Sequence, residues 1–292
     1  MIVDTVTGSS KVFGLIGSPV SHTFSPIIHN TIAKELGHEL IYVPLLVQSD
    51  TLHDAIKGAF ALYIQGLNVT IPYKNEVIKY LSKTDESASI IGAVNTLKRT
   101  ENGYVGYNTD VIGIKETFLQ NDITIAGKSV LILGAGGTAN SAATAALSEN
   151  ASEIYIVNRT LEKAHAIVEN SKKHYSKEIQ VLSYDQLSEI DRADIVIQTT
   201  SMGFAEQVDC SPITDKSFFE KVTVCLDIIY TPWETLFLKD AKQSSVKCIN
   251  GFEMLIYQAI SSYEIWNEIM IDHETKRKIC DKLTVYIQNG FA

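Results

Sequence analysis

The 292-residue chain has little of what marks a secreted, metal-binding or membrane-spanning protein. It contains four cysteines, none in a CxxC pair and none with a histidine at metal-ligand spacing, so we expect reduced thiols and no metal site. The first ten residues, MIVDTVTGSS, have neither the basic nor the apolar region of a signal peptide. No apolar run approaches the roughly 20 residues that a membrane helix needs. We therefore expect a soluble, cytoplasmic protein that does not enter a membrane.

Positive charge is also scarce. The chain has 25 Lys and Arg against 34 Asp and Glu, a formal charge of −9, which argues against a protein that binds nucleic acid or a membrane surface through a broad basic face. A small anionic ligand would need a local basic site. Apolar residues make up 45% of the chain, enough for a sizeable core, and at roughly 100–200 residues per domain the length favours two domains.

Short apolar runs alternate with helical patterns along most of the sequence. The runs show little polar alternation, which is typical of strands buried on both faces of a parallel sheet, and their alternation with helices predicts an α/β fold. The predicted strands are Val12–Gly17, Ile41–Leu46, Gly66–Thr70, Ser129–Leu133, Glu153–Val157, Ile179–Leu182, Asp194–Gln198, Val222–Asp227 and Val246–Ile249.

Local signals predict several boundaries in the first third of the chain. Ser25 is a good N-cap for the first helix, Pro26 suits its first position, and Gly37 follows its last turn. A second helical pattern, Lys74–Leu81, begins at a lysine. Asn102-Gly103 lies between two β-rich stretches and predicts a hairpin.

A change of domain is expected after this hairpin. A helical pattern at Val111–Leu119 leads to a polar break and a new strand, and two helical patterns at about 251–267 and 272–289 end the chain. We predict the following domains: a first domain of residues 1–109, completed by residues 252–292, and a second domain of residues 110–251.

A glycine-rich loop follows the strand predicted at Ser129–Leu133. The loop leads directly into a helical pattern, Ala139–Leu147, which is the strand–turn–helix setting of a dinucleotide-binding loop. Gly134 would allow the tight turn, and Gly136 would let the backbone approach a pyrophosphate that the helix N-terminus also binds. The loop residues are Gly134, Ala135, Gly136, Gly137, Thr138 and Ala139.

The next strand indicates which dinucleotide would bind. An NAD site usually has an acidic residue at the tip of this strand, about 20 residues after the glycine loop. Here Glu153–Val157 ends in Asn158-Arg159-Thr160, with Lys163 one turn later and no acidic residue at the tip. A guanidinium, a hydroxyl and a second cation suit a 2′-phosphate, so the sequence predicts NADP.

Three further polar segments lie beside predicted strands in the first 110 residues. In open α/β sheets ligands bind beyond the carboxyl ends of the strands. Hydroxyls, amides, one lysine and one aspartate would suit a small polyhydroxylated acid. The segments are Ser21–Pro26, Asn68–Lys74, and Gly92–Thr96 with Asn108–Asp110.

With these motifs in this order, nearly the whole chain resembles the shikimate dehydrogenases, NADP-dependent enzymes of aromatic amino-acid biosynthesis. GLIGSPVSHTFSPIIHN resembles the family's opening segment, and GAGGTA and NRTLEKA resemble its cofactor segments. NVTIPYK, GAVNT and YNTD resemble its catalytic segments. Asp227–Pro232 with Thr235 resembles the late strand and turn of the family, and Gly251–Leu255 with Gln258 resembles its final signature.

The resemblance implies a role for each matching residue. Lys74 and Asp110 would be the catalytic pair. The family usually has two serines in its opening segment, where Thr23 here adds a methyl group. The implied substrate-binding residues are Thr23, Ser25, Asn68, Thr70, Asn95, Tyr230 and Gln258. The implied cofactor-binding residues are Gly134, Ala135, Gly136, Gly137, Thr138, Ala139, Asn158, Arg159, Thr160, Lys163, Thr200, Met202, Gly203 and Gly251.

The implied reaction is the reversible NADPH-dependent reduction of 3-dehydroshikimate to shikimate, on the pathway to chorismate and the aromatic amino acids. The resemblance also implies an α/β substrate domain, a Rossmann-type cofactor domain with a doubly wound parallel sheet, and an active site in the cleft between them. We expect a monomer or homodimer that acts on a small molecule.

Three alternatives differ in chemistry. One is a dehydrogenase that prefers quinate or accepts both acids, with a broader cofactor preference that includes NAD. Another is a non-catalytic sensor on the same fold, which would need neither Lys74 nor Asp110. The third, a two-domain NADP enzyme acting on folates, should lack Thr23, Ser25 and Gln258.

Overall fold

The structure is a computed structural model that describes residues 6–288. The chain divides into two compact units, Met1–Gly113 with Ile256–Ala292 and Ile114–Leu255. Residues 1–5 and 289–292 lie outside the described part. The predicted domains include these residues, and the last predicted helical pattern ends at about residue 289. The chain passes between the units within two helices, α4 (Asp110–Gln120) and α8 (Gly251–Asn267).

The first unit is built on a mixed sheet, which within residues 6–288 has six strands in the order β2-β1-β3-β5-β6-β4. β1 pairs in parallel with β2 and β3, whereas β5 pairs antiparallel with β3 and β6. Its elements are β1 (Lys11–Gly17), α1 (Ser25–Leu36), β2 (Leu40–Leu46), η1 (Ser49–Thr51), α2 (Leu52–Ala61), β3 (Gly66–Val69), η2 (Glu76–Tyr80), β4 (Lys83–Thr84), α3 (Glu86–Ile91), β5 (Thr96–Thr100), β6 (Gly103–Tyr107) and α9 (His273–Gln288).

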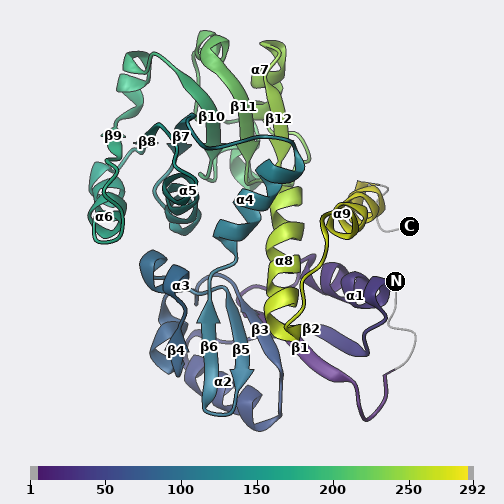
Figure 1. Ribbon diagram of the computed structural model, residues 1–292. Coiled ribbons are helices and arrows are strands. Elements are labelled where there is room, and N and C mark those ends of the chain that lie inside the picture. Colours follow the sequence, from purple (N-terminus) through teal and green to yellow (C-terminus); the bar gives the residue numbers. More distant parts are fainter. Residues whose placement is uncertain (1–5, 289–292) are drawn as a thin grey trace. The chain divides into compact units, whose positions relative to one another are not determined.

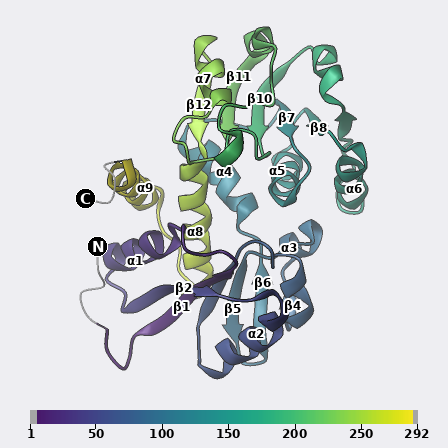
Figure 2. The ribbon, with the colours of Figure 1, turned by 180° about the vertical axis from the view of Figure 1, so that it is seen from behind.

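The apolar faces of these elements form the core of the unit. Leu67 of β3 and Leu97 of β5 are fully buried and belong to one cluster with Ile56 of α2 and Tyr104 of β6. On the other side of the unit, α1 packs against β2 and against α9, and Figures 1 and 2 both show α1 and α9 side by side. The hairpin predicted at Asn102-Gly103 is confirmed as β5–β6.

Two local predictions in this unit need correction. Ser25 is the first residue of α1 rather than its N-cap, and Phe24 precedes it without a side-chain cap. The helix predicted at Lys74–Leu81 is only the short 3₁₀ helix η2, and Lys74 lies in the turn before it. That segment is short because Val77 alone among its five residues is buried, too little to hold a longer helix against the sheet.

The second unit has the doubly wound architecture that the sequence predicts. Within the described residues its sheet is six-stranded, in the order β12-β11-β10-β7-β8-β9, with every pairing parallel. Its elements are β7 (Ser129–Leu133), α5 (Gly137–Ser148), β8 (Glu153–Val157), α6 (Leu161–Ser171), β9 (Gln180–Leu182), η3 (Tyr184–Glu189), β10 (Ala193–Gln198), η4 (Ala205–Gln207), η5 (Lys216–Lys221), β11 (Val222–Asp227), α7 (Leu236–Gln243) and β12 (Lys247–Asn250).

Apolar strands explain this arrangement. All five residues of β7 and all six of β10 are buried, as expected for central strands covered on both faces. Helix α5 packs on β7 and β8, α6 packs on β8 and β9, and α7 packs on β11 and β12 (Figure 1). The order of strands reverses between β7 and β10, and ligands of open α/β sheets bind at such a switch point.

All nine strands predicted from the sequence are confirmed, with ends that differ by at most one residue. The α/β fold in two parts is confirmed as well. No helix among residues 6–288 is both long and apolar enough to span a bilayer.

A close contact in the first unit yields a stability prediction. Gly66 of β3 faces the indole of Trp266, whose Nε1–H donates to the Leu97 carbonyl at 2.9 Å, and a Cβ on Gly66 would lie 2.4 Å from Nε1. We expect Gly66→Ala to lower the free energy of unfolding by about 1–3 kcal/mol, because the buried indole cannot move aside. Urea denaturation measures the change.

Gly58→Ala is the matched control. Gly58 lies in α2, and a Cβ there would meet no atom within 4 Å, so the substitution should raise the free energy of unfolding by about 0.5–1 kcal/mol. Equal effects of Gly58→Ala and Gly66→Ala would contradict the packing described for β3 and α8.

Candidate functional site

The first unit contains a buried network of polar side chains, with Asn68 and Asn95 at its centre. Asn68 lies within β3, not in a turn, and its Nδ2 donates to the Asn95 carbonyl and to the hydroxyls of Thr96 and Ser262, each at 3.1 Å. The Oδ1 of Asn95 accepts from the backbone N–H of Thr109 at 2.8 Å. These bonds join β3, β5, the start of α4, and α8 in one network.

The pair Lys74 and Asp110 is held by the same network. The Nζ of Lys74 donates to Asp110 Oδ2 at 2.8 Å, while Asn95 Nδ2 donates to Asp110 Oδ1 at 2.7 Å. Both carboxylate oxygens are therefore bound by side chains. The backbone N–H of Asp110, at the start of α4, donates to Asn108 Oδ1 at 3.0 Å.

A second branch of the network reaches the start of α1. Thr23 Oγ1 donates to Ser25 Oγ at 3.0 Å and accepts from the Ser25 backbone N–H at 3.1 Å. The Ser25 hydroxyl is bonded to Tyr42, whose own hydroxyl donates to Asn68 Oδ1 at 2.8 Å. Burial raises the pKa of Tyr42 well above 10, so this phenol stays protonated. Thr23 and Ser25 are thereby linked to Asn68 through Tyr42.

Of the remaining predicted residues of this unit, Gln258 joins the network at its edge, whereas Thr70 is placed by the strand that precedes it. Gln258 is on α8, and its Oε1 accepts from the Thr109 hydroxyl at 3.3 Å. Thr70 directly follows β3 and is half-buried; its backbone N–H donates to the Ile16 carbonyl at 3.0 Å. The structure brings Thr23, Ser25, Asn68, Asn95, Asp110, Lys74 and Gln258 into one network.

Tyr42 and Ser262 are network residues that sequence reasoning missed. Ser262 Oγ contacts the hydroxyls of Thr96, at 2.8 Å, and Thr109, at 3.2 Å. It lies four residues after Gln258 on the same face of α8, a spacing that could have indicated it. Tyr42 lies in an ordinary apolar strand, which gave no signal.

The glycine loop of the second unit has the geometry of a phosphate site. Gly134 has φ 111°, and a Cβ there would lie 2.6 Å from Thr199 Oγ1, so only glycine fits this turn. By contrast, a Cβ on Gly136 or Gly137 would meet no atom within 4 Å. Helix α5 then begins without a side-chain cap or an acidic residue in its first turn, while Ala139 is fully buried. Its first N–H groups can donate to an anion.

The tip of β8 lies beside a pocket. Asn158 Nδ2 donates to the Thr160 carbonyl at 2.7 Å and so fixes the turn into α6. Arg159 and Lys163 are exposed, and among residues 6–288 neither forms an ion pair with a carboxylate. The pocket has a volume of about 480 Å³ and is lined by Asn158, Arg159, Tyr184, Thr200, Ser201, Met202, Gln207, Ser211, Pro212 and Thr214.

Loop residues after β10 are held by a buried amide. Gln198 is fully buried, and its Nε2 donates to the Met202 carbonyl at 2.9 Å and to the Thr200 carbonyl at 3.3 Å. Thr200 Oγ1 accepts from the backbone N–H of Met202 at 3.1 Å. Gly203 follows, packed against Thr235. Gln198, the last residue of β10, therefore holds Thr200 and Met202 in place through their carbonyl groups.

Tyr230 and Gly251 lie near the end of β11. Burial raises the pKa of the half-buried Tyr230, whose ring lies 6.2 Å from that of Phe252. A Cβ on Gly251 would lie 2.2 Å from the Ile228 carbonyl oxygen. Gly251 is therefore required for close packing of the backbone, whether or not a cofactor also approaches it.

Known proteins similar to this chain identify its family. The family model for the shikimate dehydrogenase substrate binding domain matches residues 15–97, and the model for shikimate / quinate 5-dehydrogenase matches residues 117–215. An NADP(+) shikimate dehydrogenase of Methanocaldococcus jannaschii is 40% identical over 284 residues, covering 96% of this chain and 99% of the relative. The chain belongs to the shikimate dehydrogenase family.

Solved structures of the shikimate dehydrogenase family show the same fold. The chorismate mutase/shikimate 5-dehydrogenase fusion protein from Clostridium acetobutylicum superposes with a TM-score of 0.88 at 37% identity, covering 96% of this chain and 99% of that one. Shikimate 5-dehydrogenase from Thermus thermophilus, solved with NADP(H) and shikimate, has a TM-score of 0.81 at 28% identity and covers 93% and 99% of the two chains.

The residues of the second unit fit the NADP that the family uses. The open space at Gly136, the uncapped start of α5 and the unpaired Arg159 lie beyond the ends of adjacent strands β7 and β8. They can bind a pyrophosphate and a 2′-phosphate.

A buried carboxyl in this unit yields a pH prediction. Asp227 ends β11, is fully buried, and accepts from the Thr235 hydroxyl at 2.6 Å and the Ile229 N–H at 3.0 Å. Burial nonetheless raises its pKa from 3.8 to about 6. The folded protein therefore holds this proton more tightly than the unfolded chain, and the contribution of Asp227 to stability falls as pH rises from about 4 to about 6.

Asp227→Asn removes this titration. The free energy of unfolding of the wild type, minus that of the variant, should fall by about 3 kcal/mol between roughly pH 3 and pH 7. Urea denaturation across this range measures the difference. A difference that stays constant with pH, or that grows, would contradict the raised pKa of Asp227.

Proposed function

We propose that this chain catalyses the reversible reduction of 3-dehydroshikimate to shikimate with NADPH, on the pathway to chorismate and the aromatic amino acids. The observation that carries the proposal is the contact between Lys74 Nζ and Asp110 Oδ2 at 2.8 Å, with Asn95 bound to the other carboxylate oxygen. The names of its relatives, and the shikimate bound in the Thermus structure, support the same substrate.

Bound NADPH supplies the hydride for the ring carbonyl, and the protein must supply the proton for the carbonyl oxygen. Lys74 is half-buried and Asp110 is buried, so a charge that develops beside them is shielded from bulk water. In the proposed mechanism this pair stabilises the developing alkoxide and passes a proton to it, while Asn95 keeps the Asp110 carboxylate facing Lys74.

The remaining network residues would bind the acid. Thr23 and Ser25 lie at the start of α1, where the positive end of the helix dipole also favours a carboxylate. Asn68, Thr70, Asn95 and Gln258 would bind ring hydroxyls. Three protein oxygens already lie within hydrogen-bond distance of the two N–H groups of the Asn68 amide, so a ligand oxygen that accepts from this amide must replace one of them. Tyr230 is a further proposed substrate-binding residue.

The cofactor would be held by the second unit. The glycine loop, Gly134–Ala139, would bind the pyrophosphate. The 2′-phosphate would meet the side chains at the tip of β8 and the start of α6, namely Asn158, Arg159, Thr160 and Lys163. The nicotinamide end would meet Thr200, Met202, Gly203 and Gly251.

We infer a cytoplasmic enzyme that acts as a monomer or homodimer on small molecules and binds neither nucleic acid nor membrane. None of the four cysteines, which all lie within residues 6–288, is in a disulfide, as is usual in a reducing compartment, and the net charge of −9 disfavours polyanions. A preference for quinate is the second candidate, because the matched model covers both acids and Thr23 adds a methyl beside the proposed carboxylate site.

The test follows absorbance of the nicotinamide while purified protein oxidises shikimate or quinate with NADP or NAD. We expect the highest kcat/KM with shikimate and NADP. A higher kcat/KM for quinate would support the second candidate, and no turnover with either acid would contradict the proposal.

Lys74→Ala tests the catalytic pair. It should lower kcat by on the order of 10³-fold or more, because it removes the cation beside Asp110, while leaving the affinity for NADP unchanged. The matched control is Lys79→Ala, an exposed lysine five residues later, which should behave as wild type. A Lys74→Ala variant that keeps a tenth of the wild-type kcat would remove Lys74 from the mechanism.

A further inference from the structure

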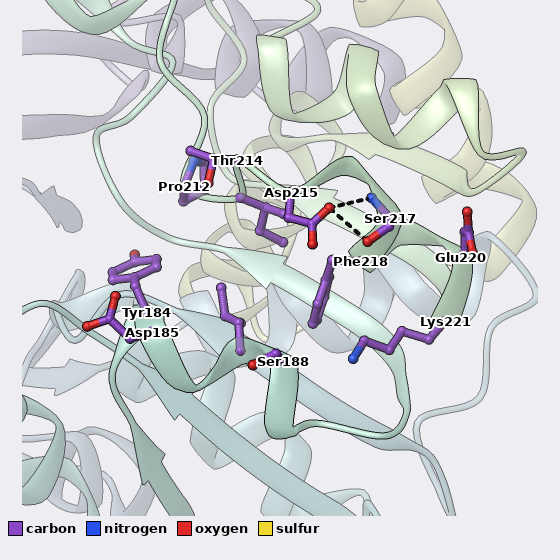
Figure 3. Close-up of a pocket in the computed structure, with 12 residues that line it drawn as sticks. Tyr184, Asp185, Ser188, Pro212, Thr214, Asp215, Ser217, Phe218, Glu220 and Lys221 are labelled. Atoms are coloured by element: carbon purple, nitrogen blue, oxygen red, sulfur yellow. Dashed lines mark hydrogen bonds between the residues drawn. The ribbon is translucent and has the colours of Figure 1, made fainter.

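Tyr184 separates two pockets of opposite charge in the second unit. It lines the 480 Å³ pocket at the tip of β8, and it also lines a neighbouring pocket of about 600 Å³. Pro212 and Thr214 are shared by the two pockets in the same way. Figure 3 shows the second pocket, with the ring of Tyr184 near one end and Phe218 and Lys221 near the other.

The charges of the two linings differ. Among the described residues that line the first pocket, Arg159 is the only one with a charge, and the others include hydroxyls and amides. The second pocket has three carboxylates in its lining, from Asp185, Asp215 and Glu220, against the single cation of Lys221. That cation is already bonded to the Ile190 carbonyl. An anion would therefore bind on the Arg159 side of Tyr184.

The strand register places Tyr184 and Arg159 side by side. Val157 of β8 pairs with Leu182 of β9 in a parallel ladder, and Arg159 and Tyr184 each follow two residues later. The ladder continues one step beyond the strands, since the N–H of Asn158 donates to the Leu182 carbonyl at 3.3 Å. The ends of both strands thus open onto the same pocket.

The protonation state of the Tyr184 hydroxyl allows it to donate a hydrogen bond. Burial raises the pKa of Tyr184, although the positive charge of Arg159 acts in the opposite direction. The hydroxyl is therefore protonated at neutral pH and lies within the field of the guanidinium. The residue is also fixed locally, because η3 begins at Tyr184 with a capping box between Ser183 and Gln186.

We propose that Tyr184 is a specificity-determining residue for the cofactor: its hydroxyl donates to the 2′-phosphate of NADP beside Arg159, while its ring forms the wall that separates this phosphate from the acidic pocket. The proposal rests on the proposed use of NADP. It adds a residue from the end of β9 to a phosphate site that the sequence motif confines to β8 and α6.

The experiment measures binding of adenosine 2′,5′-bisphosphate and adenosine 5′-monophosphate by calorimetry, so that turnover is not required. Tyr184→Phe keeps the wall and removes the hydroxyl. It should weaken the bisphosphate about tenfold or more, as expected for a hydrogen bond to a charged group, and change the affinity for the monophosphate less than about twofold. Arg159→Ala should weaken the bisphosphate further, again with little effect on the monophosphate.

Tyr175→Phe is the matched control, since Tyr175 lies in the same unit outside both pocket linings, and it should bind both nucleotides as wild type does. A Tyr184→Phe variant that keeps wild-type affinity for the bisphosphate, or that loses affinity for both nucleotides equally, overturns the role of Tyr184. A wild type without preference for the bisphosphate overturns the use of NADP and, with it, this proposal.

Discussion

The side-chain amide of Asn95 is the interaction on which the first unit's site depends. Its Nδ2 donates to the Asp110 carboxylate, and its Oδ1 accepts from the backbone N–H of Thr109. One planar group therefore fixes two adjacent residues at the start of α4. Because Asn95 is 3% exposed, any loss of these bonds would leave buried polar groups without partners, at a cost of about 1–3 kcal/mol each. This cost keeps the Asp110 carboxylate directed at Lys74.

The second unit uses buried side chains in the same way to hold exposed loops. Gln198 and Asp227 end adjacent strands, β10 and β11, and lie fully buried. Gln198 binds the carbonyls of the loop that follows β10, whereas Asp227 binds Thr235 and the backbone of Ile229. The loops that would meet the nicotinamide are thus anchored at strand ends, whereas the proposed phosphate sites would use backbone N–H groups at the start of α5 and the exposed cations Arg159 and Lys163.

Much of this fold could be predicted from the sequence because its strands are apolar and bounded by turn residues. All nine predicted strands were of this kind. Elements with few buried residues were harder: η2 looked like a helix, but only Val77 is buried, and the two-residue strand β4 gave no pattern. Helix α2 was predicted only as one of the helical patterns between strands, without bounds, although Leu52, Ile56 and Ala59 have helical spacing.

The candidate site was predictable where motifs mark it and not elsewhere. Lys74, Asp110 and Asn95 lie in recognisable segments, and the structure brings them together. Tyr42 and Tyr184 belong to ordinary strand and turn sequence, and their importance follows only from pairing between strands that are distant in the chain or from a shared pocket. Long-range register of this kind cannot be deduced from local periodicity.

A double-mutant cycle on kcat tests most directly whether Asn95 acts through the catalytic pair. Asn95→Ala alone should lower kcat by on the order of 10²-fold, because the Asp110 carboxylate loses its fixed orientation. In the Lys74→Ala background the same substitution should change kcat by less than about threefold, since the pair no longer exists. Losses that simply multiply in the double variant would show that Asn95 and Lys74 act independently, and would contradict the account.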